Sequence, residues 1–335
     1  MQTALVTGGA GYIGAVLVPK LLQRGHRVKV LDLYLFGDHV LSEFNADPLL
    51  EQIKGDIRDQ ALLRKVLPGC DTVIHLACIS NDPSFELNPL LSKSINYDAF
   101  EPLVQIAKQS GVRRFIYAST SSVYGVSESE NVTEDHPLVP VTDYNKYKGL
   151  CEPLLLKHQS PDFTTVIIRP ATVCGYSVRM RLDLSVNILT NLAVNTRRIT
   201  VFGGSQRRPN IHIEDITDLY ADLLDLPADR IAGKIYNASY QNHTIAELGE
   251  MVRTVVTREM PALAPIAVER TSTNDTRSYH VSSEKIRREL GYVPTRTVEE
   301  AVADICTAFR RGRILNPLDN IRYYNVKTIQ ASKLS

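Results

Sequence analysis

The feature that most constrains this chain is a run of glycines directly after its first apolar stretch. Gly8, Gly11 and Gly14 recur at three-residue spacing, and Gly9 overlaps them to give a Gly-x-Gly-x-x-Gly pattern. The residues before the run are typical of a strand, and those after it of a helix. Glycine here permits a tight turn, a close approach of backbone to phosphate, and close packing of helix on strand. The run therefore predicts a turn that binds the pyrophosphate of a dinucleotide.

Asp32 indicates which dinucleotide this is. It stands at the end of the second expected strand, about 20 residues after the turn, where a carboxylate accepts from ribose hydroxyls. A carboxylate there repels a 2′-phosphate, and Leu33, Tyr34 and Leu35 supply no compensating Arg or Lys. NAD is therefore favoured over NADP.

The N-terminal half alternates short β-branched runs with longer helical patterns. Strands are expected at 3–7, 28–31, 72–76, 114–117 and 165–168, and helices at 15–24, 59–67, 89–109 and 143–158. Repeated βαβ units predict an α/β fold with a Rossmann-like, doubly wound parallel sheet, whose ligands lie at the carboxyl ends of the strands. Pro102 predicts a bend or a change of register within the third helix.

The alternation of strands and helices changes after Pro170. Residues 1–170 are expected to form the NAD-binding domain, completed by a helix at 211–226 and a strand at 234–238, within about 210–240. Residues 171–209, an excursion facing the substrate, and residues 241–313 would form a smaller α/β substrate-binding cap. The tail, residues 314–335, has no clear period, and no role is assigned to it.

The composition of the chain limits the classes of binding partner that are expected. The 38 basic and 37 acidic residues cancel to +1, so no overall field favours nucleic acid or an anionic membrane, and a small ligand is expected. No apolar stretch approaches a membrane span, and a strand-like run beginning at Thr3 leaves no room for a secretory signal, so the cytoplasm is the expected location. The cysteines are odd in number and scattered, which predicts reduced core thiols and neither disulfides nor a metal site. They are Cys70, Cys78, Cys151, Cys174 and Cys306.

A second group of residues has the side chains needed for proton transfer. Tyr144 and Lys148 are four residues apart and share one helix face. A nearby ammonium stabilises a phenolate and draws its pKa toward neutrality, which would make Tyr144 a proton acceptor. The hydroxyl-rich segment 117–125 ends another strand, where a substrate hydroxyl could lie. A surface Tyr–Lys pair and simple turn chemistry are the alternatives.

Taken together, these motifs resemble the extended short-chain dehydrogenase/reductases, a family of NAD-dependent nucleotide-sugar epimerases and dehydratases. The resemblance runs from Leu5 to about Ala301. Besides the glycine turn and Tyr144-x-x-x-Lys148, it includes Gly55-Asp56-Ile57, His75-Leu76-Ala77, Asn96, Tyr117 to Gly125 and Arg169-Pro170-Ala171.

The resemblance implies roles on the cofactor side. Asp56 and Ile57 would contact adenine, Leu76 and Ala77 would line the groove, and Asn96 and Ser119 would support the nicotinamide. The full set of implied NAD contacts is Gly8, Gly11, Tyr12, Ile13, Gly14, Asp32, Asp56, Ile57, Leu76, Ala77, Asn96, Ser119, Tyr144, Lys148 and Pro170.

The resemblance also implies the catalytic groups. Tyr144 would be the base, Lys148 would tune it and hold the nicotinamide ribose, and Thr120 would occupy the catalytic Ser/Thr position. Dehydratases of the family carry an Asp-Glu pair directly after that position, where Ser121 and Ser122 stand here. This difference argues against water elimination.

The substrate side departs more from the family pattern. Arg208 would bind the substrate's diphosphate, while Thr172 replaces the usual asparagine of this region. A second arginine expected near Ser272 is absent, and Arg277 is a candidate replacement. Arg181 and Asn187 are further candidate substrate contacts. For each arginine the alternative is a structural or solvated salt bridge.

Three functions are compatible with these residues. The first is a nucleotide-sugar epimerase, acting at C4 through a transient 4-keto sugar while NAD stays bound. The second is a ketosugar reductase that uses the same three residues with NAD(P)H. The third is a non-catalytic dinucleotide-sensing protein, which would have no need of an activated phenol. By resemblance a homodimer is expected, formed through the helices at 89–109 and 143–158.

Overall fold

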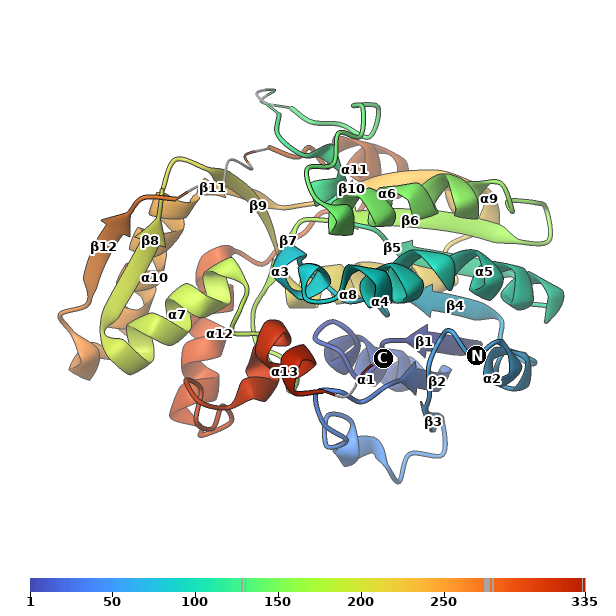
Figure 1. Ribbon diagram of the computed structural model, residues 1–335, viewed down its shortest axis with the longest axis horizontal. Coiled ribbons are helices and arrows are strands. Elements are labelled where there is room, and N and C mark those ends of the chain that lie inside the picture. The colour runs from blue at the N-terminus through green and yellow to red at the C-terminus, as the bar shows by residue number, and fades with distance from the viewer. Residues whose placement is uncertain (128, 130, 274–277, 279, 333, 335) are drawn as a thin grey trace.

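The computed structural model describes residues 1–127, 129, 131–273, 278, 280–332 and 334. Its larger part is a seven-stranded sheet in the order β10-β6-β5-β4-β1-β2-β3, in which every pair is parallel (Figure 1). The strands are β1 (Thr3–Thr7), β2 (Arg27–Asp32), β3 (Leu50–Lys54), β4 (Thr72–His75), β5 (Arg114–Ala118), β6 (Thr164–Pro170) and β10 (Lys234–Ala238). Strand order reverses between β1 and β4, which opens a crevice at their carboxyl ends. The predicted fold class is confirmed.

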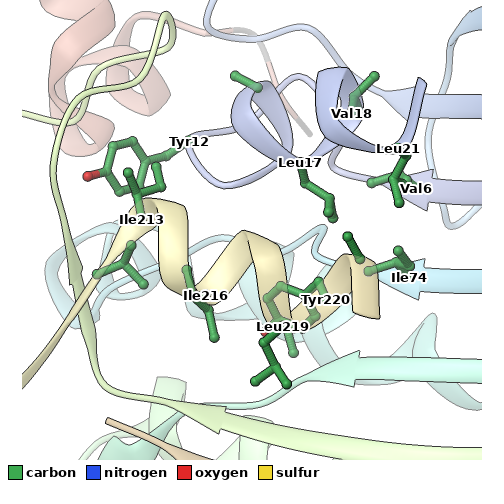
Figure 2. Packing of buried hydrophobic residues seen from close by; sticks show 14 of the residues in the cluster. Val6, Tyr12, Leu17, Val18, Leu21, Ile74, Ile213, Ile216, Leu219 and Tyr220 are labelled. Atoms are coloured by element: carbon green, nitrogen blue, oxygen red, sulfur yellow. The ribbon is translucent and has the colours of Figure 1, made fainter. Parts of the chain in front are cut away.

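Helices cover both faces of this sheet, which explains why its strands are apolar on both sides. Even-numbered residues of β1 such as Val6 pack with α1 (Gly14–Gln23) and α8 (Ile213–Asp225), as Figure 2 shows. Leu5 faces the opposite layer, which contains α2 (Gln60–Val66), α5 (Phe100–Gln109) and α6 (Asp143–Leu156). Burying each such leucine or valine contributes roughly 1.5–3 kcal/mol. The two helical layers therefore fix the positions of the carboxyl ends of the strands.

The expected helix at 89–109 is wrong as a single element. After α3 (Asp82–Glu86), the chain forms α4 (Pro89–Lys93), a π-helical turn over Ser94–Asp98, and then α5. Pro102 lies in the first turn of α5, where its missing N–H leaves no intrahelical bond unmade. The change of register therefore precedes the proline.

β3 was not expected from the sequence. It lies at the edge of the sheet, pairs only with β2 among the described strands, and carries Glu51, Gln52 and Lys54. Charged residues are common on edge strands because they discourage pairing with other chains. They also remove the apolar signal by which a strand is recognised.

Residues 171–209 are more regular than expected. They contain β7 (Thr172–Cys174), α7 (Ser185–Thr196) and β8 (Arg198–Phe202), followed by β9 (Arg207–His212), so α8 begins only at Ile213. β9 pairs with β7 and β11 (Gln241–Thr244), and β8 pairs with β12 (Ala267–Thr271). With α10 (Ile245–Glu259) and α12 (Val298–Arg310), α7 and β8 enclose a separate apolar cluster. Figure 1 shows these four elements grouped at one end of the molecule. The remaining short helices are Ser42–Phe44, Ser121–Tyr124, α9 (Ala228–Ile231), Pro261–Leu263 and α11 (Glu284–Leu290).

The tail is structured as well. After a short turn at Ile321–Tyr323 it forms α13 (Asn325–Ala331), which lies in Figure 1 between the cap and the nucleotide-binding half. The Tyr323 carbonyl accepts from Leu182 N at 2.9 Å, and the amide of Asn325 donates to Asp183 Oδ2 at 2.9 Å. Both of these partners belong to the cap, and the Nδ2 of Asn325 also donates to Ser80 Oγ, after β4, at 2.9 Å, so the tail connects the two parts of the molecule.

Candidate active site

A cavity of about 660 Å³ lies where the carboxyl ends of the sheet strands meet the cap. Its lining comes from the glycine turn, from the residues after β2, β4 and β5, from α6, from the 171–208 region and from α13. This is where a doubly wound sheet places its ligands.

The glycine turn is built for close contacts. Gly8 has φ of +73°, and a Cβ on it would lie 2.7 Å from the backbone nitrogen of Ala77. A Cβ on Gly14 would lie 2.4 Å from the Gly9 carbonyl oxygen, where helix α1 begins. The start of α1 lines the cavity, and among the described residues no side chain caps it at Ile13, which makes this helix end a favourable place for phosphate.

Asp32 ties this turn to β2. Its carboxylate accepts from the amides of Ala10 at 3.0 Å and Tyr34 at 2.7 Å. Burial raises the pKa of Asp32, and these two hydrogen bonds oppose the rise. The residues that follow Asp32 supply no arginine, but the fold brings in Arg179 from the cap, close enough to act on the charge of Asp32.

The other expected cofactor contacts divide into two groups. Most of them line the cavity: Gly8, Gly11, Tyr12, Ile13, Gly14, Asp32, Asp56, Ile57, Leu76, Ala77, Ser119, Tyr144, Lys148 and Pro170. Although burial opposes it, hydrogen bonds from Arg58 lower the pKa of Asp56. Asn96 is outside the lining, and its amide holds Ile79 through both backbone groups, at 2.8 and 2.9 Å. It therefore acts on the cavity through Ile79, which does line it.

The three expected catalytic side chains all reach the cavity. Thr120 caps the turn after β5, and its Oγ1 accepts from Ser122 N at 3.1 Å. Lys148 is buried, donates to the Ala118 carbonyl, and lies 4.4 Å from the centre of the Tyr117 ring. Tyr144 is half-buried one helical turn before Lys148. The fold therefore unites the end of β5 with one face of α6.

A buried ion pair that was not predicted above supports this arrangement. Glu152, on the same helix, binds Arg169 of β6 at 2.6 and 3.0 Å and accepts from Ser119 Oγ at 2.6 Å. Burial would lower the pKa of Arg169, but the contacts with Glu152 and Tyr124 raise it. The pair locks α6 to β5 and β6. Its sequence signal is the spacing of Lys148 and Glu152, which places a carboxylate on the helix face that carries Lys148.

The substrate-side residues are spread more widely. Thr172, Arg181 and Arg208 line the cavity, and Arg277 lies outside the described residues. Arg181 is buried, with Nε 2.9 Å from Asp183 Oδ1 and Nη1 3.2 Å from Ser80 Oγ. Arg208 is half-buried at the start of β9.

Asn187 lies behind the cavity surface. It is fully buried, accepts from Gly175 N at 3.1 Å, and donates to the Tyr12 hydroxyl at 3.1 Å and the Arg181 carbonyl at 2.9 Å. The structure thus places Asn187 as a support for Tyr12 and Arg181. Four cysteines are buried as expected, whereas Cys78 is half-buried and lines the cavity.

Sequence comparison decides the family. The sequence model of the NAD dependent epimerase/dehydratase family matches residues 4–239. The chain belongs to this family. Its membership in the extended short-chain dehydrogenase/reductases, expected from the motifs, is thereby confirmed, and with it NAD as the cofactor of the family.

Relatives within the NAD-dependent epimerase/dehydratase family differ in reaction. UDP-glucose 4-epimerase of Lactobacillus helveticus is 26% identical, over 89% of this chain and 94% of its own. UDP-glucuronic acid decarboxylase 1 of Danio rerio is 26% identical, over 92% of this chain and 72% of its own. An uncharacterized protein of Sinorhizobium fredii, y4nG, is 33% identical over 64% of this chain, and the match spans 52% of its length.

Solved structures agree with this assignment. DesIV of Streptomyces venezuelae, a dTDP-glucose 4,6-dehydratase with NAD bound, superposes with a TM-score of 0.83 at 26% identity, covering 95% of this chain and all of its own. UDP-glucuronic acid 4-epimerase of Bacillus cereus gives 0.82 at 23% identity, over 92% and 99% of the two chains, which is a likeness of fold.

The described residues fit the family's cofactor. The glycine turn leaves no room for side chains, Asp32 keeps acceptor capacity for hydroxyls, and the Nε of buried Arg179 has no hydrogen-bond partner among the described residues. Within the same residues, no group of three or more His, Cys, Asp or Glu side chains could hold a metal ion. None of the helices described is long and apolar enough to span a membrane.

Proposed function

We propose that this protein is an NAD-dependent nucleotide-sugar epimerase that acts at C4. The observation that carries the proposal is the convergence of Thr120, Tyr144 and Lys148 on one cavity whose other wall bears Arg208. Bound NAD would supply the hydride acceptor and donor. The chain supplies proton transfer, orientation and the substrate site.

Proton transfer would begin at Tyr144. Lys148 is buried and cationic, so it favours the phenolate of the tyrosine one turn before it. The phenolate takes the proton from the 4-hydroxyl, and Thr120 holds that hydroxyl and relays the proton. The C4 hydride would pass to the bound cofactor, the resulting 4-keto sugar would rotate in the cavity, and the same hydride would return to its other face. Binding the substrate through its diphosphate at Arg208 leaves the sugar free to turn.

Ser121 and Ser122 favour epimerisation over dehydration. Both line the cavity directly after Thr120, and neither hydroxyl is an acid or a base at neutral pH. Elimination of water needs both an acid and a base beside the sugar. The serines supply hydrogen bonds only.

The deciding experiment offers the purified protein a panel of UDP-, GDP-, CDP- and dTDP-sugars, without added cofactor and with added NAD or NAD(P)H, and follows the products by NMR. A C4 epimer formed without added NAD supports the proposal. Stoichiometric consumption of NAD(P)H would instead identify a ketosugar reductase, and a 6-deoxy product would identify a dehydratase.

A matched pair of variants tests the base. Tyr144→Phe removes only the phenol oxygen, and we expect kcat to fall by roughly 10²–10⁴-fold, the usual range for a general base, with NAD still bound. Tyr147→Phe is the control on the same helix, since its ring packs between Phe85 and Tyr97 at 5.7 and 5.3 Å. Equal activities of the two variants would remove Tyr144 from its assigned role.

We also expect a homodimer. Leu90 of α4 and Leu150 of α6 are 81% and 40% exposed on the helices expected to pair. Light scattering after gel filtration would measure the mass, and a monomer would contradict this expectation.

A further inference from the structure

Arg179 is a buried arginine on the cap side of the cavity that no family motif explains. It follows β7, is 4% exposed and lines the cavity. Its Nη2 donates to Asn325 Oδ1 and its Nη1 to the Met180 carbonyl at 3.4 Å. Its Nε, also buried, has no hydrogen-bond partner among the described residues. Both bonded partners are neutral oxygens.

The charge of Arg179 is only partly compensated. The two acidic side chains whose charges act on Arg179 are already engaged, because Asp32 accepts from two backbone amides and Asp183 pairs with Arg181. Neither lies within ion-pair distance of Arg179 in the described structure. Burial lowers the pKa of Arg179 to about 9, and the charge of Arg181 adds to this effect. A cation in this state is stabilised by an anionic ligand.

The surroundings of Arg179 belong to the cofactor side. Its guanidinium carbon lies 3.5 Å from the ring centre of Phe36, which follows Asp32 in the chain. The loop that carries Arg179 is also bonded to the glycine turn. Ser177 Oγ donates to the Tyr12 carbonyl at 2.9 Å, and the Tyr12 hydroxyl donates to the Gly175 carbonyl at 2.7 Å. Arg179 therefore lines the same cavity as the glycine turn, to which its own loop is hydrogen-bonded.

The tail fixes this loop. Asn325, 3% exposed at the start of α13, accepts from Arg179, and its Nδ2 donates to Ser80 Oγ at 2.9 Å. Its backbone amide holds Asp183 at 2.9 Å. One tail residue thus links the arginine loop to the segment after β4.

We propose that Arg179 binds the pyrophosphate of NAD from the cap side, opposite the glycine turn, and that Asn325 of the tail positions it. The proposal rests on NAD as the cofactor and is independent of which sugar reaction follows. It assigns the tail a role: the cofactor is enclosed between α1 and a loop that the tail holds in place. Slow release of NAD is the expected consequence.

The test measures NAD dissociation directly and needs no turnover. Protein loaded with NAD is mixed with excess etheno-NAD, and the exchange is followed by fluorescence. Arg179→Gln should speed release by about 10–100-fold, the loss expected for charge-assisted hydrogen bonds. Asn325→Ala should speed it by about 3–10-fold, since the arginine remains but loses a fixed position. Gln330→Ala, on an exposed site of α13, is the matched control and should release NAD at the parental rate.

Two further measurements make the result decisive. Arg179→Lys retains the charge and should give an intermediate rate, and circular dichroism confirms that each variant is folded. Binding of UDP to the NAD-loaded protein is measured in parallel. Unchanged NAD release in a folded Arg179→Gln variant would overturn the proposal, and weakened UDP binding in the same variant would assign the arginine to the substrate instead.

Discussion

Arg169 and Arg179 lie on either side of β7 and are both buried, yet their surroundings are opposite. Arg169, in the nucleotide-binding half, binds Glu152 through two nitrogens and the Tyr124 hydroxyl at 2.7 Å. Arg179, on the cap side, reaches only neutral oxygens and keeps an unpartnered Nε among the described residues. The charge of Arg169 is neutralised by protein groups, whereas Arg179 is suited to bind an anionic ligand. Substitutions in the nucleotide-binding half should therefore affect folding, and those on the cap wall should affect binding.

The largest effect on stability is expected at the buried ion pair between Glu152 and Arg169. Glu152→Gln leaves the Arg169 charge buried without its carboxylate, so the free energy of unfolding should fall by about 3–5 kcal/mol. Glu250→Gln, which breaks an exposed pair with Arg253, should change it by at most about 1 kcal/mol. Urea titrations monitored by circular dichroism provide both values. Similar losses of unfolding free energy in the two variants would contradict the expected difference between the buried and the exposed ion pair.

His75 gives the nucleotide-binding half a dependence on pH. It is buried, its Nδ1 lies 2.7 Å from Thr7 Oγ1, and burial, aided by the charge of Lys148, lowers its pKa from 6.5 to about 3. Between these values the unfolded chain binds a proton that the folded chain does not, so stability falls as the pH is lowered through that window. The contribution of His75 at pH 5 should be about 2 kcal/mol less than at pH 7.5.

The variant His75→Asn keeps an acceptor near Thr7 and cannot take up this proton. Urea titrations at pH 7.5 and pH 5 would measure its free energy of unfolding. The decrease between these two pH values should be about 2 kcal/mol smaller in the variant than in the parent. His39→Asn, at an exposed site, should leave the dependence unchanged. Parallel curves for His75→Asn and the parent would show that His75 titrates normally in the folded chain.

The smallest effect on stability is expected at the cap wall. Arg208→Gln should change the free energy of unfolding by less than about 0.5 kcal/mol, because the side chain is half-exposed. The same variant should raise the Kd for UDP about 10-fold, since it removes a charge-assisted contact with the diphosphate. Arg207→Gln is the control on the opposite face of β9, and calorimetry should find its UDP affinity within about twofold of the parent. A large loss of stability in Arg208→Gln would make this arginine structural.

The cofactor side could be recognised from the sequence because its signals are local. Gly8, Gly11, Gly14 and Asp32 are recognised by backbone geometry and by their spacing along one βαβ unit. Tyr144 and Lys148 are recognised because a four-residue spacing places them on one helix face. The parallel sheet followed from the same alternation of strands and helices. The edge strand β3 was missed because its half-buried position removes the apolar pattern.

The cap side was decided by tertiary structure. Arg179 approaches Asp32 from 147 positions away, and Asn325 approaches Arg179 from 146 positions away. Nothing local in residues 314–335 marks them as part of a site. Whether a buried charge is paired depends on which distant side chains the fold brings within a few ångströms. Local sequence patterns were enough to predict a nucleotide-binding fold and to propose Tyr144 and Lys148 for proton transfer, whereas only the folded chain shows that Arg169 is paired and that Arg179 lines the cavity.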